Sequence, residues 1–198
     1  MERREALRRT SMMMGGVISA PTLAALLNGC GPSRTAGWQP SLFTPEQALM
    51  VEDIADRIIP TTDTPGAKAA GVPKFIESIV QEVYLQKERD RFLAGLTEVN
   101  TKSQEKFSDD FTSLEKEQQN EILNEYNAGL AAEKLPAGHY DNTVNDYNPS
   151  FFRMIKELTI EGYYESEIGA KEELAFLRIP GSYKACMPLE EQGKTWAI

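Results

Sequence analysis

Apolar side chains recur at helical spacing through most of the chain beyond residue 43. In the first such stretch the apolar positions are Met50, Val51, Ile54, Ala55 and Ile58, which fall on one face of a helix. The same spacing returns over residues 72–83, 87–107, 114–126 and 151–159, the second of which continues or restarts the helix before it. No stretch alternates like a half-buried strand. The pattern predicts a mostly α protein with a compact helical domain of four to six helices.

Local signals mark where these helices begin and end. Thr44-Pro45-Glu46-Gln47 predicts a helix start, because its threonine can cap, its proline suits the first helical position and its glutamine completes a capping box. Ile59-Pro60 predicts the end of that helix, and Val72-Pro73 opens the next one. Thr112 and Glu115 offer another capping box. Residues 133–149 are rich in Pro, Gly and Asn and predict a loop.

The stretch from residue 162 to the C-terminus has a different character. It is dense in aromatic residues, glycine and proline, and its helical period is weak. Such a tail either lies in extended form against another protein, where Tyr and Trp contribute most to binding, or packs back on its own helices. The sequence favours neither arrangement, so we predict only an irregular C-terminal tail.

The N-terminal residues 1–29 combine a basic head with an apolar run, which is the pattern of an export signal. Within the head, Arg3 and Arg4 begin a segment, Arg3-Arg4-Glu5-Ala6-Leu7-Arg8, that resembles the twin-arginine motif for export of folded proteins. Two alternatives stay open: a plain basic head for unfolded export, and an apolar run that remains in the membrane. The glycine, proline and asparagine residues in the run make it a poor span.

Leu27-Asn28-Gly29-Cys30 resembles a lipobox, in which the cysteine is acylated and the chain is cut before it. Cys30 is therefore the candidate lipidation site, unless it is a chance cysteine after an apolar segment. Each buried methylene of an acyl chain contributes about 0.8 kcal/mol, so several chains hold a domain firmly. The predicted organisation is a signal peptide over 1–29, a tether over 30–42 and a helical domain over 43–198.

The net charge of the chain limits the classes of partner that it can bind. Acidic residues outnumber basic ones by 30 to 21, for a formal net charge of −9. An acidic chain repels phosphate backbones, so we expect no nucleic acid partner, and its charge argues against electrostatic docking on anionic lipid. Membrane contact would then depend on the lipid anchor, on the periplasmic side of the envelope, in either the inner or the outer membrane.

The sequence lacks the common signatures of catalysis. It has one histidine, His139, and two cysteines, Cys30 and Cys186, that form no CxxC pair. It contains no GxGxxG after a strand, no CxxCH, no GxSxG and no P-loop. Cys186 either pairs with a partner or remains a buried free thiol. We therefore expect no enzyme activity and no catalytic, cofactor-binding or metal-binding residue in this chain.

Two stretches carry a resemblance to a known family. The first is residues 43–46, 54–60, 63–67 and 70–76, with ADRIIP-x-x-D-x-PGA as its most specific string, and the second is residues 162–169 and 180–196. Together with the twin-arginine start they resemble the gluconate 2-dehydrogenase subunit 3 family. The resemblance covers nearly the whole chain.

The resemblance implies an accessory role. Such small subunits serve membrane-associated dehydrogenases whose large subunit, a GMC-type oxidoreductase, binds FAD and oxidises a sugar, sugar acid or alcohol. A cytochrome c subunit with several haem groups often takes the electrons. The small subunit carries the export signal and is needed for the large one to mature or to be secreted. Because FAD is loaded in the cytoplasm, the partner must cross the membrane folded.

The two stretches also supply the candidate partner interface. Its residues are Arg57, Pro60, Asp63, Pro65, Gly66, Tyr163, Tyr164, Pro180, Gly181, Tyr183 and Trp196. In the alternative interpretation, the turn from Pro60 to Gly66 is internal scaffold. A function of another class also stays open, a standalone envelope lipoprotein that acts as a binding or scaffold module.

Overall fold

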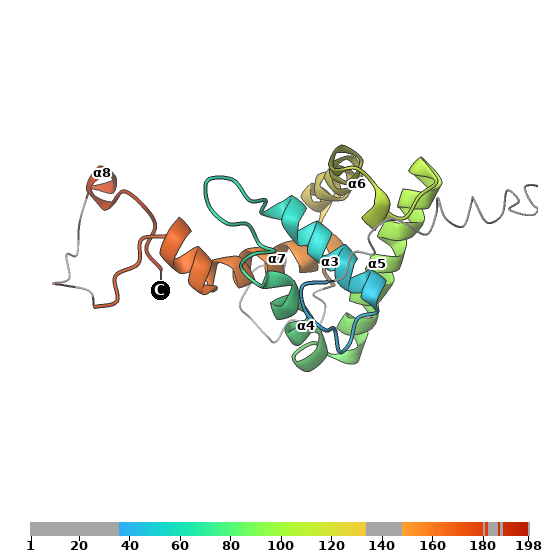
Figure 1. Cartoon of the computed structure of the whole chain (residues 1–198), viewed down its shortest axis with the longest axis horizontal. Coiled ribbons are helices and arrows are strands. Elements are labelled where there is room, and N and C mark those ends of the chain that lie inside the picture. Colours follow the sequence, from blue (N-terminus) through green and yellow to red (C-terminus); the bar gives the residue numbers. More distant parts are fainter. Residues whose placement is uncertain (1–35, 134–147, 180, 182–185, 187, 198) are drawn as a thin grey trace, which may run out of the picture. The chain divides into compact units, whose positions relative to one another are not determined.

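The computed structural model describes residues 36–133, 148–179, 181, 186 and 188–197. Their substantial helices are α3 (Pro45–Ile58), α4 (Val72–Glu82), α5 (Gln86–Phe107), α6 (Lys116–Gly129) and α7 (Phe151–Tyr164) (Figure 1). Shorter elements are η1 (Phe111–Ser113), η2 (Leu130–Ala132), the π-helical turn η3 (Gly169–Glu173) and α8 (Leu189–Gln192). No strand occurs within these ranges, and the prediction of a mostly α domain is confirmed. Arg3, Arg4, Cys30 and His139 lie outside the described residues.

Helix α3 begins and ends where its sequence signals predict. The Thr44 hydroxyl accepts a hydrogen bond from the Gln47 amide at 3.2 Å, and the Gln47 side chain accepts one from the Thr44 amide at 3.0 Å. The two bonds form the predicted capping box and satisfy donors that a helix start leaves without partners. Ile59 caps the other end, directly before Pro60.

The start of α6 differs from the prediction. The capping box joins Glu115 and Gln118, whose side-chain oxygen accepts the Glu115 amide at 3.1 Å, whereas the predicted box at Thr112 is wrong. Thr112 lies in η1 because Phe111 is fully buried and its amide donates to the Asn100 side chain at 2.9 Å. This anchoring turns the chain at η1, so the helix begins later.

Helix α7 forms the centre of the core and packs against α3, α4 and α5. The ring of Phe92 on α5 stacks on Phe43 at 5.9 Å between centroids and meets Phe151 of α7 edge-on at 5.1 Å. Gly95 lets α5 and α7 approach, since a Cβ there would lie 2.1 Å from the Phe151 ring. Aromatic packing therefore fixes the N-terminal end of α7, which Ser150 caps.

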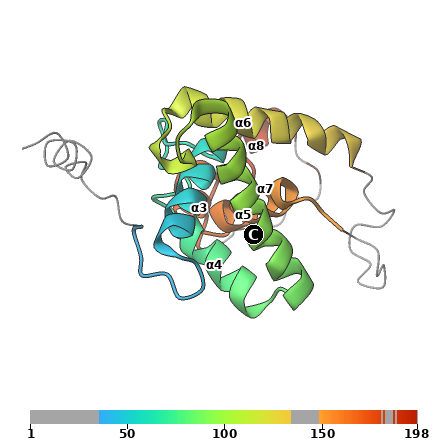
Figure 2. The same cartoon turned by 90° about the vertical axis from the view of Figure 1, so that its right-hand side faces the viewer.

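The segment that precedes α3 is held on the domain. We call residues 36–43 the N-terminal strap. The carboxylate of Glu77 on α4 accepts the Trp38 indole N–H at 2.6 Å and the backbone amides of Ser41, Leu42 and Phe43 at 2.8 to 3.1 Å. Residues 36–42 belong to the stretch that the sequence predicts as a tether, so the described part of that stretch is docked on the helices (Figures 1 and 2).

Replacing Glu77 with alanine should release the strap. Glu77 is 4% exposed and is the shared acceptor of four strap donors. Hydrogen bonds to charged groups contribute about 1.5–3 kcal/mol each, and released donors regain water, so the free energy of unfolding should fall by about 2–4 kcal/mol. Urea unfolding measures the loss, and Trp38 fluorescence in a Trp196→Phe background reports exposure of the strap. Glu82→Ala, an exposed glutamate of the same helix, should change neither.

The same contact should weaken at acidic pH. Burial alone would raise the pKa of Glu77, but the hydrogen bonds from Phe43, Trp38, Leu42 and Ser41 outweigh it and hold the pKa below its ordinary value of 4.5. A carboxylate whose pKa falls on folding stabilises the fold fully above that ordinary value. Its contribution is lost as the pH falls through the lower folded-state pKa, so the strap should detach there in wild-type protein.

Candidate partner-binding site

The connection from α3 to α4 is a tight turn that depends on one glycine. The amide of Ala67 donates to the Ile59 carbonyl at 2.9 Å, and the Gly66 amide donates to the Thr61 hydroxyl at 3.1 Å. A Cβ on Gly66 would lie 2.6–2.7 Å from backbone atoms of Ile59, Pro60 and Thr61. The Pro-Gly pair of the sequence therefore closes a turn whose two ends are in direct backbone contact.

Substituting Gly66 with alanine should destabilise the domain. The neighbouring atoms belong to the backbone and cannot move aside as a side chain could, so overpacking should cost about 1–3 kcal/mol. Thermal unfolding measures this. The matched control is Gly129→Ala at the end of α6, where no atom lies within 4 Å and alanine should raise stability by about 0.5–1 kcal/mol. Equal stability of the Gly66 variant and wild type would contradict the packing argument.

Tyr163 joins this turn to the end of α7. Its hydroxyl donates to the Pro65 carbonyl at 2.9 Å across 98 positions of sequence, and its side chain is almost fully buried. The two stretches that carry the family resemblance therefore meet in the fold. Tyr163 and Gly66 are both buried, and their role in partner binding stays a prediction.

A tight turn follows α7. Ser166 Oγ donates to the Tyr163 carbonyl at 2.6 Å and accepts the Gly169 amide at 2.9 Å. The turn η3 that follows is tied to the α3–α4 connection by a 3.0 Å hydrogen bond from the Thr64 hydroxyl to Glu173. The connection and the end of α7 thus form one continuous surface.

Beyond η3 the chain forms what we call the C-terminal arm, the described residues from 174 to 197. A parallel bridge joins Ala175 to Trp196, with the Ala175 amide donating to Thr195 at 2.8 Å and the Ala197 amide to Ala175 at 3.0 Å. Large apolar side chains of the arm remain exposed: Phe176 by 48%, Leu177 by 53%, Ile179 by 81% and Trp196 by 45%. Exposed apolar residues that gather in this way mark interaction surfaces.

A hollow of about 620 Å³ lies where the arm meets the end of α7. It is lined by Tyr164, Glu165, Ala170, Leu174, Thr195 and Trp196. Two of the sequence-predicted residues, Tyr164 and Trp196, therefore share one concave site.

The remaining residues of the predicted partner interface differ in their exposure to solvent. Pro60, Asp63 and Gly181 are exposed, and Pro65 is half-buried. Asp63 accepts a hydrogen bond from the Thr62 hydroxyl at 3.0 Å, which lowers the pKa of its carboxyl below the usual range. Pro180 and Tyr183 lie outside the described residues.

Arg57 lies in the last turn of α3, directly before the same connection. Its guanidinium pairs with Asp56, and 10% of its side chain is exposed. Its Nε is buried without a hydrogen-bond partner among the described residues. The arginine is therefore held near the turn as a largely buried cation.

Cys186 is exposed and forms no disulfide within the described residues. The alternative of a buried thiol is therefore wrong, because the residue itself is exposed to solvent. Pairing with a partner remains a prediction.

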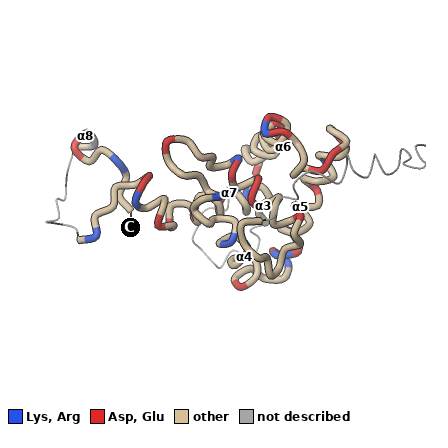
Figure 3. The backbone as a smooth tube through the Cα atoms, in the orientation of Figure 1, with Lys and Arg blue, Asp and Glu red and all other residues tan. Residues whose placement is uncertain are grey.

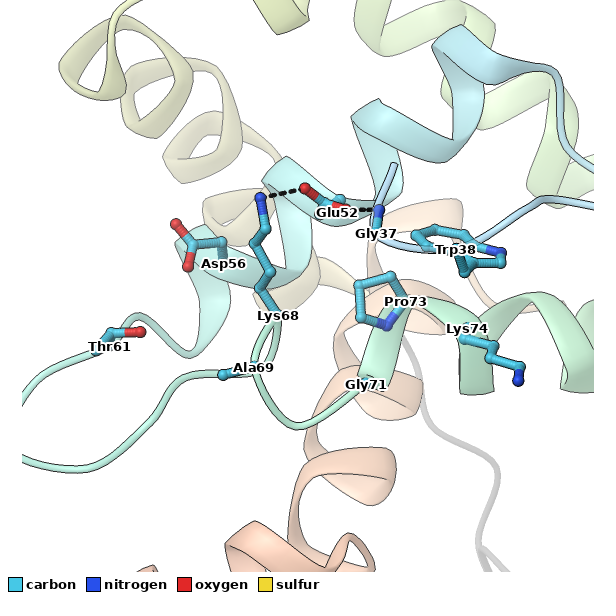
Figure 4. A pocket seen from close by; sticks show the side chains of 10 residues that line it. All are labelled: Gly37, Trp38, Glu52, Asp56, Thr61, Lys68, Ala69, Gly71, Pro73 and Lys74. Carbon is cyan, nitrogen blue, oxygen red and sulfur yellow. Dashed lines mark hydrogen bonds and ion pairs between the residues drawn. The ribbon is translucent and has the colours of Figure 1, made fainter. Parts of the chain in front are cut away.

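A second hollow, of about 420 Å³, opens beside the start of the N-terminal strap (Figure 4). It is lined by Gly37, Trp38, Glu52, Asp56, Thr61, Lys68, Ala69, Gly71, Pro73 and Lys74. Sequence reasoning missed Trp38 and Glu52. The Glu52 side chain is 3% exposed, pairs with Lys68 and accepts the Gly37 amide at 3.0 Å.

Three further properties of the described chain concern metal binding, surface charge and membrane insertion. No cluster of three or more His, Cys, Asp or Glu residues suited to a metal ion occurs within it. Acidic and basic residues are interspersed along the helices (Figure 3), and Lys106 on α5 pairs with Glu121 and Glu125 on α6. Among the helices in these ranges, none has the length and apolarity needed to cross a bilayer.

The fold defines a small, mostly α domain that presents an apolar C-terminal arm. The chain belongs to the gluconate 2-dehydrogenase subunit 3 family, whose model matches residues 45–181. The match runs from the first residue of α3 into the arm. Comparison with curated proteins and with solved structures gave no match.

Proposed function

We propose that this chain is a non-catalytic accessory subunit that supports the maturation, export and membrane anchoring of an FAD-dependent dehydrogenase. The observation that carries the proposal is membership in the gluconate 2-dehydrogenase subunit 3 family. The family name describes a subunit of a dehydrogenase complex, so a partner that performs the oxidation is the direct expectation. In this complex FAD belongs to the large GMC-type subunit, and haem belongs to a cytochrome c subunit where one is present.

The C-terminal arm and the adjoining turn form the proposed interface with the large subunit. Tyr164 and Trp196 line a hollow there, and Leu177 and Ile179 of the same arm present aliphatic side chains to solvent. Aromatic anchors of this kind dominate binding energy when a partner covers them, and the aliphatic side chains add apolar area that is buried on binding. The hydrogen bonds of Tyr163 and Thr64 hold the arm's base against the α3–α4 connection, which limits the ordering entropy lost on binding.

Export and anchoring rest on the N-terminal sequence. Arg3 and Arg4 would direct the chain and its folded partner through the twin-arginine route, and acylated Cys30 would hold the complex on the periplasmic side of the envelope. One small subunit would thereby supply both the export signal and the membrane anchor for a partner that has neither.

Co-purification from membranes tests the proposal. The full chain, tagged at its C-terminus and extracted with mild detergent, should bring down a larger flavin-containing polypeptide in constant ratio. A monodisperse chain without such a partner would favour a standalone envelope lipoprotein instead.

A further inference from the structure

We propose that the face around the start of the N-terminal strap, formed by Gly37, Trp38, Lys68 and Lys74, is turned toward the phospholipid bilayer that anchors the chain. This inference rests on the proposed function, which places the acyl chains at Cys30. It adds an orientation of the domain on the membrane. The contacts of the strap and the length of chain between Cys30 and the strap determine that orientation.

Few residues separate the proposed anchor from the described domain. Six residue steps separate Cys30 from Ala36, and a fully extended chain covers about 3.5 Å per step, so the reach is about 21 Å. A compact domain of this size has a radius of gyration of about 15 Å and is about 40 Å across. Bringing the opposite face to the bilayer would need a reach close to that width. The strap's starting point therefore stays near the lipid.

Docking of the strap is what makes the reach short. The Gly37 amide is held by buried Glu52 at 3.0 Å, and the Trp38 indole is held by Glu77 at 2.6 Å. If the strap were detached, free chain would run from Cys30 to Thr44, about 49 Å when extended. That reach exceeds the width of the domain, and the domain could then turn any face to the membrane.

The chemistry of this face suits a lipid headgroup layer. Glu52 is paired with Lys68 (Figure 4). Asp56 is paired with Arg57, so both carboxylates that line the hollow are already neutralised. Lys74 is exposed and forms no ion pair with a described residue. Trp and Lys are residues that favour the interface between membrane and water. The acyl chains supply the affinity, and these side chains allow close approach without repulsion of anionic phosphates.

Energy transfer from two dye positions to the bilayer tests the orientation. The full acylated chain with Cys186→Ser receives a donor dye at Lys74→Cys or at Ala128→Cys, and is placed in phosphatidylethanolamine–phosphatidylglycerol vesicles that contain a headgroup acceptor dye. Ala128 is exposed at the end of α6, and in Figure 2 that end lies on the other side of the domain from the strap's start. Transfer should be greater from position 74. Equal transfer, or greater transfer from position 128, would overturn the proposal.

Two further variants test the role of the strap. Glu52→Ala combined with Glu77→Ala removes both carboxylates that hold the strap and should abolish the difference between the two dye positions. Insertion of a flexible segment of about ten residues between Thr35 and Ala36 adds about 35 Å of reach and leaves the domain intact, so it should do the same even if the double variant folds poorly. If the difference persists with the insertion, the short distance between Cys30 and the strap does not set the orientation.

The mass of the N-terminal peptide shows whether Cys30 is acylated, so failure of the lipid anchor can be distinguished from failure of the proposed orientation. An acylated Cys30 with equal transfer from both positions would overturn the orientation alone. A peptide without acyl groups would overturn the anchor itself, and with it the orientation. An acylated peptide together with stronger transfer from position 74 supports both.

Discussion

Charging the C-terminal arm should abolish recovery of the large subunit with this chain. In the variant Leu177→Asp/Ile179→Asp, two carboxylates replace aliphatic side chains that are 53% and 81% exposed in the isolated chain. If a partner covers both residues, each substitution should cost about 2 kcal/mol of binding, and together they weaken the complex by about a thousandfold. Quantitative pull-down from detergent-solubilised membranes measures the loss.

The turn between α4 and α5 provides a matched control for this variant. Val83 and Leu85 are 65% and 73% exposed and lie outside the proposed interface. Val83→Asp/Leu85→Asp makes the same change in charge and a similar change in apolar area, and it should leave recovery of the large subunit unchanged. Both double variants should unfold near the wild-type temperature because none of the four side chains belongs to the core. If both lose the partner equally, the arm is not the interface.

Conservative replacement of two arginines should stop export of the partner. In Arg3→Lys/Arg4→Lys the net charge of the head is unchanged, so an ordinary basic signal would still function. The twin-arginine route reads the arginine pair itself, so the flavin-containing subunit should remain in the cytoplasm with its FAD. Cell fractionation followed by flavin and dehydrogenase assays on each fraction measures the change.

Two neighbouring arginines serve as the control for the export variant. Arg8→Lys/Arg9→Lys has the same chemistry and the same number of substitutions, but it keeps a basic residue at position 8 and leaves the arginine pair intact. Export of the partner should continue in this variant. Undiminished export in Arg3→Lys/Arg4→Lys would show that folded export does not depend on this chain's head.

Local signals were sufficient to predict most of the helical framework. The capping box at Thr44 and the proline at position 73 each depend on residues within one turn of helix, and α3 and α4 begin there. The start of α6 escaped this reasoning because Phe111 is buried by residues distant in sequence. Its burial and the bond to Asn100 make a 3₁₀ turn of the stretch that resembled a helix start.

The site was predictable only in part. The two resembling stretches meet in the fold, but the bond from Tyr163 to Pro65 spans 98 positions and no spacing predicts it. Docking of the strap was not predicted because Gly, Pro and Ser suggest a linker. Trp38 among them was a signal, since the N–H of a buried Trp usually forms a hydrogen bond. Glu77, an acid beside apolar Ile76 on a helix, was the other available signal.

In the proposed complex the redox group belongs to a partner that this chain accompanies through export and anchors to the membrane. Native mass spectrometry of the complex purified from membranes, together with the same measurement on the signal-free chain alone, tests this most directly. We expect FAD only in species that contain a second, larger polypeptide, and the isolated chain at its bare polypeptide mass. FAD bound to the isolated chain, with oxidation of a sugar or alcohol by that chain alone, would contradict it.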